Sequence, residues 1–177
     1  MLPNIAALSD AQCALLKKFV GNGGSIVATF ETSLYDEEDK ARENFGLADV
    51  FGVSYDKGVE GPMQNSYLKF KSDPVTKAFH PVLDRLDNVF RVINFIYRVK
   101  VKPTVDFPSP VTLIPTYPDL SMEDVYPRIP DTNTRELYLG EYGKGRVAYF
   151  PGDADRSFWE TLNTDHLHRQ GFFIKIV

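Results

Sequence analysis

The chain has 177 residues, enough for one domain that buries most of its apolar surface without covalent cross-links. Its net charge of −4 and its scattered Lys and Arg argue against a nucleic-acid-binding protein, which would show a clustered basic surface. The single cysteine, Cys13, excludes an internal disulfide and a cysteine-rich zinc site.

The first elements in chain order are a helix and a strand. Ser9 and Gln12 match a capping box, and Gly21 stands where a helix would end. Residues 25–30 form a short apolar run rich in β-formers, as in a strand buried on both faces. The apolar residues of the helix are expected on one core-facing side: Ala11, Leu15, Leu16, Phe19 and Val20.

Helix, glycine turn and strand make the second half of a βαβ unit. Residues 1–4 resemble only the end of an earlier strand and its exit loop. We therefore expect the first strand and helix of the unit to be missing from this chain.

The rest of the chain predicts mostly strands and loops. Basic residues Arg98, Lys100 and Lys102 alternate with apolar ones and are interpreted as the solvent-exposed face of a strand. Residues 103–130 hold seven of the twelve prolines and predict a long loop, and a helix is expected after Asp155. Short helices are expected at 47–51 and within 74–86, and strands at 66–71, 94–102, 111–115, 135–141 and 146–150, with a hairpin turn at 143–145.

Three stretches together resemble a known family. They are LPNIAALSDAQ (2–12) leading into GGSIVATFETS (23–33), FPSPVTL (107–113) with RELY (135–138), and GRVAYFPGDADR (145–156) followed by Phe158 and Trp159. They resemble the class I glutamine-amidotransferase-like domains attached to bacterial sugar hydrolases, in particular the trimerisation domain of family 42 β-galactosidases. The resemblance implies an α/β domain over residues 1–177 with a flavodoxin-like, mainly parallel sheet and flanking helices, belonging to a longer chain.

The resemblance does not extend to the amidotransferase nucleophile. Active members carry a Cys on a sharp strand-to-helix elbow, with a partner His and Glu. Here the only cysteine lies inside the first helix, and the chain contains no G-x-C-x-G or G-x-S-x-G motif. Near the elbow position the chain offers Thr29, Phe30 and Glu31 instead. We expect Cys13 to be a packing residue and amidotransferase activity to be absent.

Charged residues follow two predicted strands at the ends where α/β sheets place their sites. Glu31 follows the first strand, and Asp153, Asp155 and Arg156 follow the last. In a structural interpretation Asp155 caps the next helix and Arg156 pairs with Asp153 or Glu31. In a ligand-binding interpretation the carboxylates and Arg156 hold a sugar hydroxyl or a carboxylate, beside the aromatic Trp159.

Two further groups are weak candidates for a metal site. The carboxylates of residues 36–39 lack the spacing of a calcium loop and are expected to form a solvated acidic loop. His166 and His168 alternate without a third ligand nearby. No metal or other cofactor is expected.

Three functions remain open. The first is a non-catalytic accessory or oligomerisation domain of a β-galactosidase-like hydrolase, in contact with a catalytic domain or with copies of itself. The second is a small-ligand or sugar-binding module that uses the carboxylates and Arg156. The third is a glycoside hydrolase, with Glu31 and Asp153 as carboxyl groups about 5 to 9.5 Å apart. No nucleic-acid or membrane partner is expected, and the lack of a signal peptide predicts a cytoplasmic location.

Overall fold

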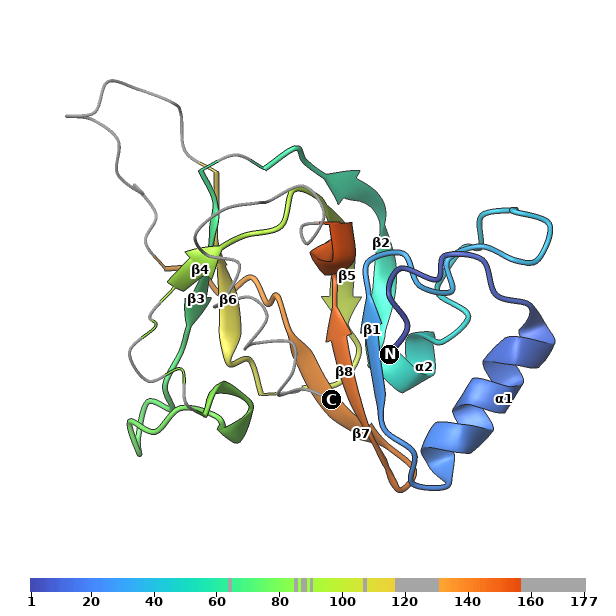
Figure 1. Ribbon diagram of the computed structural model, residues 1–177, viewed down its shortest axis with the longest axis horizontal. Helices are drawn as coiled ribbons and strands as arrows, with labels where there is room; N and C mark the ends of the chain where they lie inside the picture. The colour runs from blue at the N-terminus through green and yellow to red at the C-terminus, as the bar shows by residue number, and fades with distance from the viewer. Residues whose placement is uncertain are drawn as a thin grey trace.

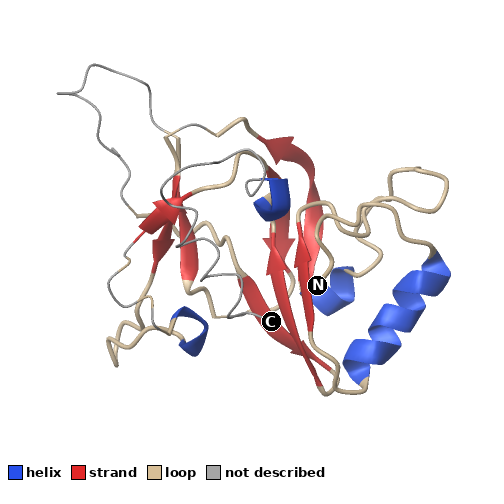
Figure 2. Cartoon of the chain, in the orientation of Figure 1, coloured by secondary structure: helices blue, strands red, loops and turns tan. Residues whose placement is uncertain are grey.

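A computed structural model describes residues 1–63, 65–84, 86, 89, 91–106, 108–116 and 131–156. These residues form an α/β arrangement of short helices and three small sheets (Figure 2). The elements are α1 (Asp10–Gly21), β1 (Ile26–Thr29), α2 (Ala48–Phe51), β2 (Val53–Glu60), β3 (Tyr67–Phe70), a 3-10 helix (Pro81–Leu83), β4 (Arg91–Ile93), β5 (Arg98–Pro103), β6 (Val111–Ile114), β7 (Tyr138–Tyr142) and β8 (Gly145–Phe150). None of the helices among these residues has the length and apolar character needed to cross a membrane.

The central sheet has the strand order β1-β8-β7 and separates two apolar cores. Successive side chains of a strand point to opposite faces, so Ile26 and Ala28 enter one core and Val27 enters the other. On β8, Tyr149 and Phe150 divide between the two cores in the same way. The expectation that residues 25–30 contain a strand buried on both faces is confirmed.

Different layers cover the two faces of the central sheet. Figure 1 shows α1 and α2 on one side of it and the sheet β4-β3-β6 on the other. The remaining pair, β2 and β5, is antiparallel, with a bulge between Tyr55 and Val59. Lys57 and Gly58 adopt positive φ angles of 47° and 139° there. This bulge breaks the alternation of apolar and polar residues, which is why the sequence analysis did not predict β2.

The expected mainly parallel sheet is not confirmed. Among the described strands, only β1 and β8 pair in parallel. Two isolated parallel bridges, from Leu2 to Ala28 and from Ala7 to Tyr35, lie outside these strand pairs. The other pairings are antiparallel. One reason is local: a tight turn with Gly143 at φ 61° returns β7 directly onto β8.

Helix α1 begins as predicted but is rotated relative to the prediction. The capping box is present: the Ser9 hydroxyl accepts from the Gln12 N–H at 3.2 Å, and the Gln12 side chain accepts from the Ser9 N–H at 2.8 Å. The predicted core face is wrong, because Leu15 and Phe19 are 67% and 55% exposed. Cys13 and Val20 are the buried residues of the helix.

Cys13 is therefore a packing residue, as predicted. Cys13 and Leu15 are two residues apart and so lie on opposite sides of the helix. Burial raises the pKa of the Cys13 thiol. Phe19 lies against Gly24, where a β-carbon would stand only 2.4 Å from the ring. The glycine turn after α1 thus leaves room for an aromatic ring outside the core.

Candidate functional site

The carboxyl ends of β1 and β8 bring together several of the residues selected from the sequence. Thr29, the last residue of β1, is paired with Phe150, the last residue of β8. Because the two strands are parallel, the segments that follow them leave the same edge of the sheet. Figure 1 shows the helical turn of residues 154–156 directly beyond the end of β8. We call Thr29, Tyr97, Asp153, Asp155 and Arg156 the strand-end cluster.

Thr29 and Asp155 connect the two strand ends. The buried Thr29 hydroxyl donates to Asp155 Oδ1 at 3.0 Å and accepts from the Asn4 N–H at 2.9 Å. The prediction that Asp155 caps the next helix is wrong, since residues 154–156 are already helical. Asp153 occupies the position directly before this helix, and the Asp155 side chain contacts Thr29 of β1.

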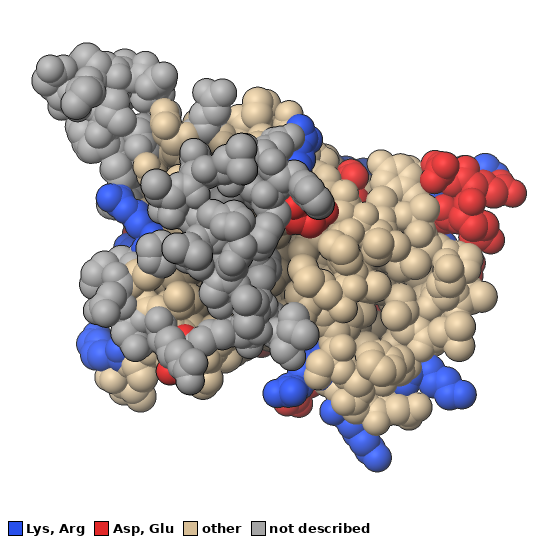
Figure 3. Space-filling model, in the orientation of Figure 1, with Lys and Arg blue, Asp and Glu red and all other residues tan. Residues whose placement is uncertain are grey.

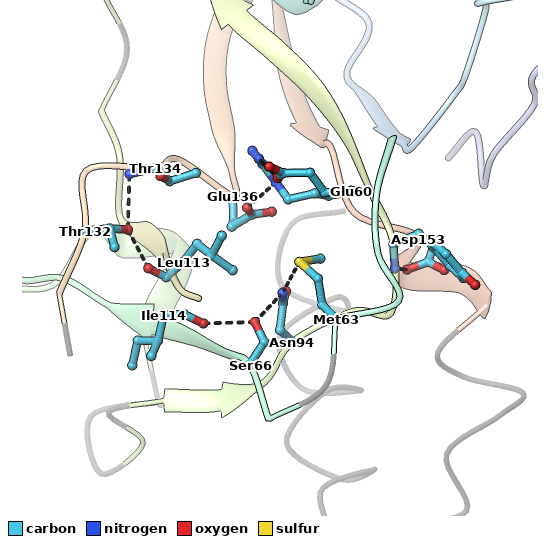
Figure 4. Close-up of polar contacts among 12 residues, drawn as sticks. Glu60, Met63, Ser66, Asn94, Leu113, Ile114, Thr132, Thr134, Glu136 and Asp153 are labelled. Carbon is cyan, nitrogen blue, oxygen red and sulfur yellow. Dashed lines mark hydrogen bonds and ion pairs between the residues drawn. The ribbon is translucent and has the colours of Figure 1, made fainter. Parts of the chain in front are cut away.

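Asp153 is buried and joins the end of β8 to the segment before β5. Its Oδ1, drawn in Figure 4, accepts from the Tyr97 N–H at 2.9 Å. Its own N–H donates to the Tyr97 carbonyl at 3.0 Å. Its Oδ2 is buried and has no hydrogen-bond partner among the described residues. Burial raises the pKa of Asp153 to about 6, while the Tyr97 N–H acts in the opposite direction.

Arg156 lies over an aromatic ring at the same place. Its guanidinium carbon is 5.1 Å from the centroid of the Tyr97 ring, a cation–π distance. The charge of Arg156 also lowers the pKa of Asp153. The cluster therefore places a buried carboxylate, a cation and an aromatic ring side by side.

Glu31 follows β1, at the start of a turn. It is half-buried, and burial raises its pKa. Its charge is the largest cause of the raised pKa of Tyr35. Within the described residues, no hydrogen bond or ion pair joins Glu31 to Asp153 or Asp155. Trp159, His166 and His168 lie outside the described residues.

The backbone after β1 does not form a nucleophile elbow. Phe30 has a left-handed φ of 52° and Ser33 one of 67°, and both belong to a turn, so no helix follows the strand directly. The Phe30 N–H donates to the Phe150 carbonyl, and the Phe30 carbonyl accepts from the Tyr149 hydroxyl at 2.7 Å. A nucleophile elbow instead exposes a Ser or Cys on a strand-to-helix turn.

The acidic loop of residues 36–39 gathers at one corner of the molecule, where Figure 3 shows a concentration of acidic side chains. The Asp36 carboxylate accepts from the Glu38 and Lys40 N–H groups, and Lys40 pairs with Glu38 at 2.6 Å. Over the part of the chain that the structure describes, no three metal-binding side chains come together. The carboxylate of Asp36 thus shapes a turn.

A second charged group, which the sequence analysis missed, lies in the interior. Arg98 Nε is 2.6 Å from Glu136 Oε1, and Arg98 Nη1 is 2.7 Å from Glu60 Oε2. The side chains of Arg98, Glu136 and Glu60 are 7%, 0% and 43% exposed. We call these three residues the buried charge cluster.

The buried charge cluster corrects the interpretation of Arg98 as part of an exposed strand face. Lys100 and Lys102 are exposed as predicted, but Arg98 bridges to Gly152 and lies inside the molecule. Glu136 stands in a segment covered on both sides, where Leu137 and Tyr138 are also buried. The three charges are far apart in the sequence, so no local pattern signals their contact.

Burial and the neighbouring charges shift the pKa values of Glu136 and Tyr138. Burial raises the pKa of Glu136 to about 7, Arg98 acts against this, and Glu60 adds to it. Burial, followed by the charge of Glu136, raises the pKa of Tyr138 to about 12. The carboxyl group of Glu136 therefore changes its charge near neutral pH.

Comparisons with known proteins identify fold relatives. No family model matches the sequence, and no curated protein matches it. The β-galactosidase from Bacillus circulans sp. alkalophilus superimposes with a TM-score of 0.65 and 14% identity, over 97% of this chain and 21% of the enzyme. A catalytic mutant of Gan42B, a GH42 β-galactosidase from G. stearothermophilus, gives a TM-score of 0.59 and 19% identity, over 96% of this chain and 20% of the enzyme.

A smaller protein has the same fold. The cytoplasmic protein STM3548 from Salmonella typhimurium gives a TM-score of 0.54 and 20% identity, over 92% of this chain and 59% of that protein. The chain spans only about a fifth of the length of the β-galactosidases. The resemblance inferred from the sequence is confirmed at the level of the fold: this chain is structurally similar to a domain-sized part of family 42 β-galactosidases.

Proposed function

We propose that this chain is a non-catalytic, amidotransferase-like accessory domain of a β-galactosidase-like hydrolase. The observation that carries the proposal is the fold match, which covers nearly all of this chain but a fifth of each β-galactosidase. The site chemistry supports it, because Cys13 is buried in α1 and Phe30 follows β1 in a turn. We place this domain in the cytoplasm, because its structural relative STM3548 from Salmonella typhimurium is a cytoplasmic protein.

The partner in this proposal is a sugar-hydrolase catalytic domain or another copy of the chain. The outer face of α1 supports an association role. Ala11, Leu15 and Phe19 are exposed at spacings of four residues, which aligns them along one side of the helix. An exposed apolar stripe of this kind is typical of an interface.

Light scattering over a range of protein concentrations tests self-association. We expect a mass above that of one chain, reduced by Leu15→Glu. Val75→Glu is the matched control, because Val75 is also exposed and apolar but lies far along the chain from α1. A monomer at every concentration, from a gene that encodes no hydrolase domain beside this one, would overturn the proposal.

A small-ligand or sugar-binding module is the second candidate. It is supported by Asp153 Oδ2, which has no hydrogen-bond partner in the described part of the chain, and by Arg156 over the Tyr97 ring. It is weakened by the contacts that already occupy Thr29, Asp155 and the other oxygen of Asp153. Calorimetry with galactose distinguishes the two: heat of binding that Asp153→Asn abolishes would favour the module, and its absence favours the accessory domain.

A further inference from the structure

The buried charge cluster lies where the three sheets meet. The Glu136 N–H donates to the Val111 carbonyl of β6. Its side chain reaches Arg98, the first residue of β5, and Arg98 also contacts Glu60, the last residue of β2. Two residues after Glu136, Tyr138 begins β7. Figure 4 shows the carboxylates of Glu60 and Glu136 converging on this junction.

The cluster carries more negative than positive charge when both carboxylates are ionised. One guanidinium faces two carboxylates, and one of these, Glu136, is fully buried. The 2.6 Å approach of Arg98 Nε to Glu136 Oε1 lacks hydrogen-bond geometry, and within the described residues neither Glu136 oxygen accepts a hydrogen bond. An ionised carboxylate is unfavourable in the interior when its one charged partner is shared with a second carboxylate, and a proton on Glu136 removes the surplus charge.

We propose that protonation of Glu136 controls the junction of β5, β6 and β7. The junction is tightly packed while Glu136 is protonated and loosens when Glu136 is ionised. This response of Glu136 to pH belongs to the fold and involves no ligand or partner.

The neighbouring groups leave Glu136 as the residue that responds. Arg98 remains charged, and Glu60 is half-exposed on β2. Burial raises the pKa of Tyr138 on β7 to about 12 and that of Tyr149 on β8 well above its ordinary value, so both stay neutral. Arg135, the preceding residue, is paired with Asp106. The pKa of Glu136 is about 7 because burial outweighs the attraction of Arg98.

The sign of the pH effect follows from linkage. The pKa of Glu136 rises from 4.5 to about 7 on folding, so the folded protein holds a proton that the unfolded chain releases. The stabilisation is complete below pH 4.5 and is lost as the pH rises through 7.

Carbon-13 NMR titration of glutamate carboxyl groups tests the protonation directly. We expect one resonance with a midpoint near neutral pH, absent from Glu136→Gln. In Glu60→Gln the surplus carboxylate is removed, so the midpoint should move to lower pH. The shift in Glu60→Gln can be observed even if Glu136→Gln fails to fold. A spectrum in which every glutamate titrates below pH 5 would overturn the proposal.

Hydrogen exchange tests the loosening. Rates corrected for the intrinsic effect of pH should show protection of β5 and of residues 135–139 falling between pH 6 and pH 8. Protection of β1 should stay constant, and Glu136→Gln should remove the pH effect. Equal protection of β5 at the two pH values, or a uniform loss of protection over the whole chain, would contradict control of this junction by Glu136.

Discussion

The strand-end cluster and the buried charge cluster use charged side chains in different ways. In the strand-end cluster each carboxylate meets a neutral donor: Asp155 meets the Thr29 hydroxyl and Asp153 meets the Tyr97 N–H. In the buried charge cluster, Glu136 meets a charged guanidinium, and its oxygens accept no hydrogen bond from the residues that the structure describes. The carboxylates at the strand ends are therefore held by neutral donors, whereas the contact printed on Glu136 comes from the charged Arg98.

The largest predicted effect separates the two clusters most sharply. Arg98→Met leaves Glu136 buried without its partner, so we expect a loss of about 3 to 5 kcal/mol in the free energy of unfolding at pH 8. At pH 5 the loss should be smaller, because Glu136 is then protonated. Urea denaturation at the two pH values measures both. Lys100→Met on the same strand is the control and should change stability by less than about 0.5 kcal/mol. Equal losses at both pH values would contradict the cluster's charge balance.

Thr29→Val tests the neutral donor of the strand-end cluster. It keeps the shape of the side chain but leaves Asp155 Oδ1 and the Asn4 N–H without a partner. We expect a loss of about 1 to 3 kcal/mol, visible in the midpoint of urea denaturation. Thr104→Val, at an exposed position, provides the control. A loss no larger than that of the control would mean that the two strand ends are not joined by this hydroxyl.

Asp153→Asn tests whether charge is needed at the strand end. The amide oxygen can still accept from the Tyr97 N–H. Since the pKa of Asp153 rises from 3.8 to about 6 on folding, its ionisation costs stability as the pH rises through 6. We expect the variant to gain about 1 to 2 kcal/mol at pH 8 and almost nothing at pH 4. Thermal denaturation across this range provides the measurement, and a loss at pH 8 would show that the charge itself holds the site together.

The smallest effect is expected at Arg156. Its exposed guanidinium lies over the Tyr97 ring, so Arg156→Gln should cost about 0.5 to 1 kcal/mol. Arg156→Lys keeps the charge but loses the flat stacking surface, and thermal denaturation of the two variants separates charge from stacking. An effect as large as that of Arg98→Met would remove the distinction between the two clusters.

Features set by neighbouring residues could be predicted from the sequence. The capping box of α1, the buried strand β1 and the hairpin of β7 and β8 each depend on a few consecutive side chains. The sequence also predicts that Asp153, Asp155 and Glu31 follow strands at the same kind of sheet edge, but it did not predict the contact of Asp155 with Thr29.

Features set by contacts between distant segments could not be predicted. The rotation of α1, which exposes Leu15 and Phe19, depends on what packs against Cys13 and Val20. Arg98 looked solvent-exposed because it alternates with valines in the same way as Lys100 and Lys102 do. Its burial depends on Glu136, which lies 38 residues farther along the chain. The residues next to Arg98 and those next to Glu136 therefore do not indicate that the two form a buried ion pair.

Residues 97–99 and 151–153 also form a short backbone ladder between the two clusters. The Val99 N–H donates to the Pro151 carbonyl, the Asp153 N–H donates to the Tyr97 carbonyl, and Arg98 bridges to Gly152. A β-carbon on Gly152 would stand 1.9 Å from the Phe95 ring, so this position admits only glycine without displacing the ring. The ladder therefore joins Arg98 of the buried charge cluster to Asp153 of the strand-end cluster through consecutive backbone contacts.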